Sequence, residues 1–133
     1  MKKLLAIASL VALSAQAATP AQIQGSYTAE AQNSQRAFTP SAQRGAELFR
    51  QNFNQQADMP SCTSCHTNDP RQEGKHAVTG KRIRPLAVVA NPERFSDPAK
   101  VEKWFGRNCK EVVGRACSAG EKADFVAYMS EVR

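Results

Sequence analysis

The chain has 133 residues, a formal net charge of +6 and 41% hydrophobic residues, which suits one small domain with a modest hydrophobic core. The positive charge suits an acidic protein partner, but the sequence contains no nucleic-acid-binding motif. No stretch after residue 17 is long and apolar enough to cross a membrane.

Residues 1–17, MKKLLAIASLVALSAQA, have the order of a secretory signal peptide. Two lysines are followed by a ten-residue apolar run and then by an A-x-A cleavage site. The apolar run is about half as long as a membrane span. We therefore expect cleavage after Ala17, export to the periplasm and no membrane span in the mature chain, which would comprise residues 18–133.

Residues 18–39 are rich in Ala, Gln, Ser and Thr. They are predicted to form an N-terminal extension or a short helix. A helix that begins at Pro20 would place Ile23, Tyr27 and Ala31 on one side.

One domain is predicted over residues 40–133, and its first helix over residues 40–54. Thr39 would be the N-cap of this helix, with a proline at the first helical position. Apolar residues follow at helical spacing. Gly45 has no side chain, so a second helix could approach closely at that point.

The segment Cys62-Thr63-Ser64-Cys65-His66 is a C-x-x-C-H motif, which is typical of covalent c-type haem attachment. The two thiols would form thioethers with the haem vinyl groups, and His66 would bind the iron as the proximal ligand. A redox C-x-x-C motif prefers a βαβ unit, which is absent here. A zinc site would need further ligands at zinc spacing, and Cys109 and Cys117 do not provide it. One covalent haem c is therefore the predicted cofactor.

The two remaining cysteines are Cys109 and Cys117. Thiols in an oxidising compartment pair unless they are used otherwise. If the haem takes Cys62 and Cys65, we expect a disulfide between the other two that closes a short loop.

The second half of the chain predicts a loop followed by two helices. Residues 68–97 are punctuated by proline and glycine and read as a long loop that packs on the porphyrin. Asp97-Pro98 predicts a helix from Pro98 to about Asn108. A capping box at Ser118 predicts a last helix that ends near Glu131.

This order of elements is the layout of the class I cytochrome c fold, an all-α fold around one covalent haem in which the first and last helices cross. The residues that resemble this crossing are Gly45 and Phe49 on the first helix and Phe125 and Tyr128 on the last.

The motif leaves the second axial ligand of the iron open. Met59 is too near the attachment site to reach across the ring, and Met129 has the spacing of a core residue. His76 lies in GKHAVTG, which resembles a stretch of mitochondrial-type cytochromes c where the histidine forms a structural hydrogen bond. Met129 or His76 as ligand would give a closed electron-transfer site.

The helix over residues 98–108 offers another candidate. Its residues at positions i, i+3, i+4 and i+7 are Val101, Trp104, Phe105 and Asn108. They form one stripe, and its last member is an amide. Asn108 is either a C-terminal cap or a ligand that binds the iron through its amide oxygen. Cross-linking of Cys109 would hold the backbone beside it.

Residues 40–133 resemble the sphaeroides haem protein family. The strongest markers are the C-x-x-C-H motif, the NPERF and VEKWF stretches, and Arg107-Asn108-Cys109 with Cys117. The resemblance implies that Asn108 binds ferric iron as the distal ligand and leaves on reduction. The opened pocket, walled by Trp104 and Phe105, would then bind oxygen or nitric oxide. The resemblance also implies a dihaem cytochrome c, or another redox protein, as the electron donor.

The predicted protein is thus a periplasmic monohaem cytochrome c with His66 and Asn108 as iron ligands. If it is an enzyme, it would reduce oxygen or convert nitric oxide to nitrate, and no sequence feature selects a reaction. Two alternatives remain: a simple electron-transfer cytochrome with a closed six-coordinate iron, and a non-catalytic gas-binding sensor.

Overall fold

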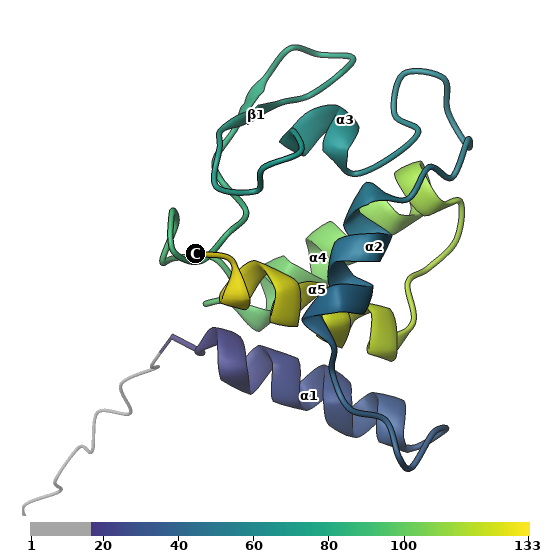
Figure 1. Cartoon of the computed structure of the whole chain (residues 1–133), viewed down its shortest axis with the longest axis vertical. Coiled ribbons are helices and arrows are strands. Elements are labelled where there is room, and N and C mark those ends of the chain that lie inside the picture. Colours follow the sequence, from purple (N-terminus) through teal and green to yellow (C-terminus); the bar gives the residue numbers. More distant parts are fainter. Residues whose placement is uncertain (1–16) are drawn as a thin grey trace, which may run out of the picture.

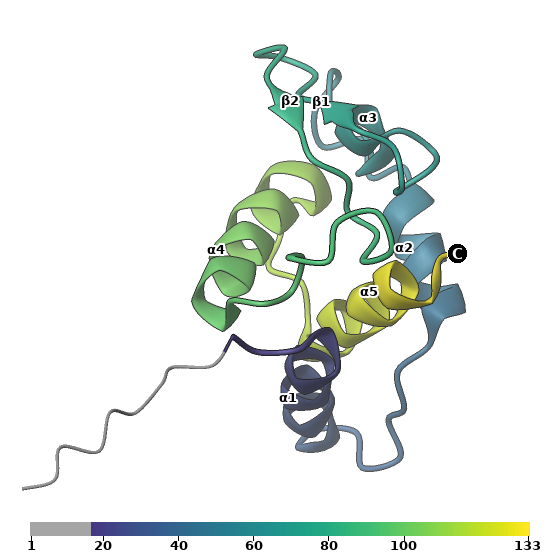
Figure 2. The same cartoon turned by 90° about the vertical axis from the view of Figure 1, so that its left-hand side faces the viewer.

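The computed structural model describes residues 17–133, and its regular structure is almost entirely helical, with long irregular segments between the helices. The helical elements are α1 (Pro20–Gln32), α2 (Ala42–Arg50), α3 (Thr63–His66), α4 (Pro98–Asn108), the π-helical turn η1 (Cys109–Val113) and α5 (Ala119–Glu131). Figures 1 and 2 show α1 at one end of the molecule and α3 at the other. The prediction of an all-α fold is confirmed. The predicted signal peptide lies outside the described residues, apart from Ala17.

Helix α1 is a well-capped part of the core. The Thr19 side chain accepts a hydrogen bond from the backbone of Gln22, whose side chain accepts one from the Thr19 backbone. This capping box satisfies two backbone N–H groups that a helix start leaves without partners. Ile23, Tyr27 and Ala31 are buried, as their spacing predicts, and α1 packs along α5.

Helices α2 and α5 cross at Gly45, as the sequence predicts. A Cβ atom at Gly45 would overlap the carbonyl oxygen of Asp124 and would lie 2.9 Å from Cβ of Tyr128. Glycine therefore allows the two backbones to approach within a distance that any side chain would prevent. The ring of Phe49, one turn later, packs against Phe125 and Tyr128 at centroid distances of 6.2 and 5.8 Å.

The predicted bounds of α2 are wrong at both ends. The N-cap is Ser41 rather than Thr39, because the Ser41 hydroxyl accepts a hydrogen bond from the backbone N–H of Arg44. The backbone N–H of Ser41 is in turn held by the Asp124 carboxylate at 2.7 Å. The helix ends at Arg50 because Gln51 adopts an extended conformation with ψ of 134°.

The last two helices begin where the sequence predicts. The Asp97 side chain caps α4, and the reciprocal bonds of Ser118 and Glu121 form the capping box of α5. Helix α4 ends at Asn108, as predicted, and the chain continues directly into η1, which ends at Gly114 with a φ of 81°.

The long loop is confirmed, with one short addition. Strands β1 (Gly74–Lys75) and β2 (Arg82–Ile83) form an antiparallel pair in which Gly74 lies opposite Ile83. Further along, the backbone N–H of Val88 donates to the carbonyl oxygen of Met129 at 2.9 Å. The loop is thus tied to the end of α5.

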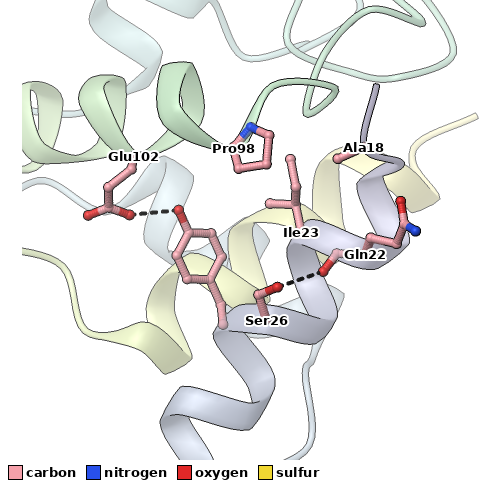
Figure 3. Close-up of a pocket in the computed structure, with 7 residues that line it drawn as sticks. Ala18, Gln22, Ile23, Ser26, Pro98 and Glu102 are labelled. Carbon is pink, nitrogen blue, oxygen red and sulfur yellow. Dashed lines mark hydrogen bonds between the residues drawn. The ribbon is translucent and has the colours of Figure 1, made fainter. Parts of the chain in front are cut away.

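Two further features bear on function. A groove of about 260 Å³ lies between α1 and the first turns of α4, lined by Ile23, Pro98 and Glu102 among others (Figure 3). Within residues 17–133, no helix has the length and apolar character needed to cross a membrane.

Candidate functional site

The C-x-x-C-H motif forms a single helical turn, α3. Backbone N–H groups of Cys65 and His66 donate to the Cys62 carbonyl oxygen at 3.3 and 3.1 Å. Residues three and four apart on a helical turn lie on the same side, so the turn presents both thiols and the imidazole together. Thr67, with φ of 61°, ends the turn. Both cysteines are unpaired and partly buried.

Burial around α3 favours the uncharged forms of Cys62 and His66. Burial lowers the pKa of His66 to about 4, with a contribution from the positive charge of Arg94. Burial also raises the pKa of Cys62 to about 11. A neutral imidazole is the form of histidine that binds a metal, so His66 has the protonation state that an iron ligand requires.

The β1 strand passes very close to the motif. The backbone N–H of Ala77 donates to the sulfur of Cys65 at 3.3 Å. A Cβ atom at Gly74 would overlap the Cys65 carbonyl oxygen and would lie 3.1 Å from Cα of His66. Gly74 was not predicted as a site residue. Its signal in the sequence is a lone glycine in the loop, which by itself marks only a turn.

The predicted stripe of α4 faces two different directions in the structure. Val101 and Phe105 pack against the core, where the Phe105 ring meets Tyr27 and Phe125 at 5.7 and 5.5 Å. Trp104 and Asn108, four residues apart, lie on an exposed side, and 42% of Trp104 is accessible. The contacts of Phe105 are therefore those of a core residue, whereas Trp104 shares a face with Asn108.

Asn108 is not a conventional helix cap. Its φ of −68° and ψ of −36° are helical, and its side chain makes no capping hydrogen bond. A C-capping asparagine usually takes the left-handed conformation, so the C-cap interpretation is wrong. Asn108 stands where the α-helix becomes a π-helical turn, a feature that is frequent at functional sites.

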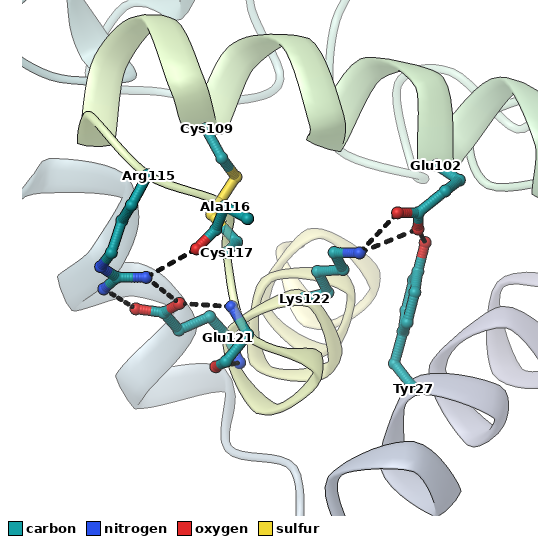
Figure 4. The surroundings of a disulfide bond; sticks show 9 residues. Tyr27, Glu102, Cys109, Arg115, Ala116, Cys117, Glu121 and Lys122 are labelled. Carbon is teal, nitrogen blue, oxygen red and sulfur yellow. Dashed lines mark hydrogen bonds and ion pairs between the residues drawn. A yellow bond between two sulfur atoms is a disulfide. The ribbon is translucent and has the colours of Figure 1, made fainter.

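A disulfide fixes the backbone beside Asn108. Cys109 and Cys117 are joined, with their Cα atoms 5.7 Å apart (Figure 4). Gly114, at the end of η1, lies against Gln55 in the segment that leads to the C-x-x-C-H motif. Both overall views place the C-terminal end of α4 in the half of the molecule that carries α3 (Figures 1 and 2).

The other ligand candidates have structural roles. Met129 is fully buried in the core. Nδ1 of His76 accepts hydrogen bonds from the backbone N–H groups of Val78 and Thr79, each at 3.2 Å, which stabilises the turn between β1 and β2. Met59 is also buried.

These residues fit a covalent haem. The thiols are free and correctly spaced, and the imidazole is neutral. Trp104, on the same face of α4 as Asn108, is 42% exposed. Its apolar ring suits contact with the apolar face of a porphyrin.

Comparison with known proteins gives a consistent result. The family described as a domain of unknown function (DUF1924) matches residues 35–129. "Cytochrome c-type protein SHP" of Cereibacter sphaeroides is 45% identical over 113 residues, which are 84% of this chain and 83% of the relative. "Cytochrome c''" of Methylophilus methylotrophus is 44% identical over 91 residues, which are 68% of this chain and 63% of the relative.

Solved structures show the same similarity. The structure described as oxidized SHP, "an oxygen binding cytochrome c", has a TM-score of 0.76 at 45% identity and covers 84% of this chain and 96% of that one. Oxidized cytochrome c'' from Methylophilus methylotrophus has a TM-score of 0.78 at 37% identity, covering 86% of this chain and 94% of that one.

Proposed function

The chain belongs to the sphaeroides haem protein family of c-type cytochromes, and we propose that it is a periplasmic monohaem cytochrome c that accepts electrons and binds a diatomic gas. Cys62 and Cys65 would hold one haem c through thioether bonds, and His66 would bind its iron. The haem supplies a one-electron iron couple and a coordination position for the gas.

The observation that supports this proposal best is the placement of Asn108. It is an exposed amide, not used as a cap, on the same face as the exposed Trp104 and beside a disulfide that restrains its backbone. An amide oxygen is a hard, weak ligand that suits Fe(III) better than Fe(II). Asn108 would therefore hold ferric iron in the oxidised protein and release it on reduction, which would leave the site open to oxygen or nitric oxide.

The family resemblance suggests the partner, a dihaem cytochrome c or another redox protein. A simple electron carrier with a closed iron is less well supported, because Met129 is committed to the core and His76 to the hairpin turn. Oxygen reduction, nitric oxide oxidation and gas sensing all use the same open site, and turnover assays with each gas would separate them.

The test is the absorption spectrum of the haem-loaded protein, oxidised and reduced, with and without carbon monoxide. We expect carbon monoxide to change the spectrum of the reduced protein alone. Asn108→Ala should shift the oxidised spectrum from low spin toward high spin. Asn33→Ala, which alters an exposed asparagine at the end of α1, is the matched control. A reduced spectrum unmoved by carbon monoxide, or an oxidised spectrum unmoved by Asn108→Ala, would contradict the proposal.

A further inference from the structure

Helix α4, which carries Asn108, contacts the core mainly through the partly buried side chains of Val101 and Phe105. None of its residues is buried, whereas α1 buries Ile23, Tyr27 and Ala31 and α5 buries five residues. Among the helices and strands, α4 makes its most extensive backbone contacts with η1, which follows it directly in the chain. The groove of about 260 Å³ between α1 and the start of α4 further limits apolar packing there. Specific contacts with α1 and α5 therefore add to the apolar packing that positions α4.

One of these contacts is a polar cluster that joins three helices through Glu102. The Tyr27 hydroxyl of α1 donates to Oε2 of Glu102 at 2.8 Å. Nζ of Lys122, on α5, donates to both carboxylate oxygens at 2.7 and 2.9 Å. The same Nζ lies 5.1 Å from the centre of the Tyr27 ring. Figure 4 shows the Glu102 carboxylate of α4 bonded to both Tyr27 and Lys122.

The cluster is partly shielded from water and carries opposite charges. Tyr27 is 9% exposed and the Lys122 side chain 13%, although the Glu102 side chain is 56% exposed. Lys122, followed by Tyr27, lowers the pKa of Glu102, and burial together with Glu102 raises the pKa of Tyr27. At neutral pH the carboxylate is therefore ionised, and Tyr27 keeps the proton that it donates. Hydrogen bonds to a charged group are the stronger kind.

The cluster and the disulfide hold α4 at two points on either side of the ligand residue. Glu102 precedes Asn108 by six residues, about 9 Å along a helix, and Cys109 follows it directly. The disulfide restrains the end of the helix, and Glu102 restrains its rotation about its own axis. Rotation matters because a weak ligand binds only when it is held close to its ideal position.

We propose that Tyr27, Glu102 and Lys122 are positioning residues that set the orientation of α4, so that Asn108 remains on the iron in the oxidised state. This inference rests on the proposed function of Asn108. Loosening the cluster frees the iron site in the oxidised protein but changes little in the reduced protein, where Asn108 has already withdrawn.

The test compares ligand binding in the two oxidation states of the haem-loaded protein. Glu102→Gln removes the charge, and Tyr27→Phe removes only the hydroxyl and keeps the ring beside Phe105. Imidazole at pH 8 probes the oxidised state as a neutral ligand, and carbon monoxide probes the reduced state. Glu93→Gln, which breaks the exposed ion pair with Arg84, is the matched control.

We expect Glu102→Gln to raise the high-spin fraction of the oxidised spectrum and to tighten imidazole binding about fivefold or more. Tyr27→Phe should act in the same direction and more weakly. The dissociation constant for carbon monoxide should stay within about twofold of that of the wild type. In an Asn108→Ala background, Glu102→Gln should have no further effect on the oxidised state, because no ligand remains to be positioned.

Each outcome separates this inference from the proposed function. If Asn108→Ala changes the oxidised spectrum but Glu102→Gln and Tyr27→Phe do not, the positioning role is wrong and the ligand role stands. If Glu102→Gln still acts when Asn108 is absent, it acts by another route and the inference is also wrong. If Asn108→Ala itself has no effect, both proposals fail. Tyr27→Phe keeps the test decisive if Glu102→Gln does not fold.

Discussion

Replacing Gly45 by alanine should strongly destabilise the protein. The new Cβ atom would overlap the carbonyl oxygen of Asp124 and lie 2.6 Å from its carbonyl carbon and 2.9 Å from Cβ of Tyr128. These are backbone atoms and the first side-chain atom of a helix, so they can give way only if α2 and α5 move apart. Overpacking typically costs 1–3 kcal/mol, and we take the upper end, about 3 kcal/mol. Alanine recovers about 1 kcal/mol through helix propensity. The net loss is about 2 kcal/mol, or about 8 °C in Tm for a domain of this size.

The assay is thermal unfolding of the oxidised haem-loaded protein, followed by circular dichroism at 222 nm. Gly25→Ala is the matched control, because Gly25 lies within α1 and a Cβ atom there meets nothing within 4 Å. The control should gain about 0.5–1 kcal/mol from helix propensity alone. If Gly45→Ala raises Tm as Gly25→Ala does, the close crossing of α2 and α5 is not what requires glycine.

Three further changes test other parts of the structure. Replacing Cys109 and Cys117 together by serine should lower the free energy of unfolding by about 2.5 kcal/mol, the loop-entropy estimate for a sequence separation of 8. Urea unfolding measures this loss. An unchanged midpoint would show that the disulfide does not stabilise the fold. Asp124→Ala should lower the free energy of unfolding by about 2 kcal/mol in the same assay. The reason is that the buried carboxylate accepts hydrogen bonds from the Ser41 backbone and the Arg44 guanidinium. A loss below about 0.5 kcal/mol would contradict this role. Lys122 and Tyr27 lower the pKa of Glu102 below its ordinary value of 4.5, so its stabilising effect is complete above that pH and is lost as the pH falls through the folded-state pKa. The Tm of the wild type should therefore fall more steeply below pH 4.5 than that of Glu102→Gln, and parallel curves would show that Glu102 is not responsible.

The starts of α4 and α5 were predictable because their capping hydrogen bonds are local, whereas the start of α2 depends on a distant residue. Asp97 and Ser118 cap helices as the sequence predicts, because each bonds to backbone three residues away. Thr39 and Ser41 are both residue types that cap helices. Ser41 caps α2 because its backbone N–H donates a hydrogen bond to Asp124, which is 83 residues away in the sequence. Local sequence contains no information about that partner.

Asn108 illustrates the same limit within the candidate site. Its spacing with Trp104 and Phe105 predicts one stripe, but the structure turns Phe105 toward Tyr27 and Phe125 and leaves Trp104 and Asn108 on an exposed side. The helical period gives relative angles around an axis. It does not say which part of the stripe the neighbouring helices will cover.

The sequence by itself determined the features that depend on consecutive residues. The C-x-x-C-H motif needs only one helical turn to bring Cys62, Cys65 and His66 together, so its chemistry could be read directly from the five residues. The crossing at Gly45 was also predictable, because a glycine among helical apolar residues favours close approach.

The tertiary structure decided what depends on residues far apart in the chain. Gly74 lies against Cys65 only because the hairpin folds back on the motif. Glu102 joins Tyr27 and Lys122, which are 75 and 20 residues away, only because α1 and α5 pack on either side of it. Such contacts follow from the packing of whole helices, which no local pattern of residues specifies.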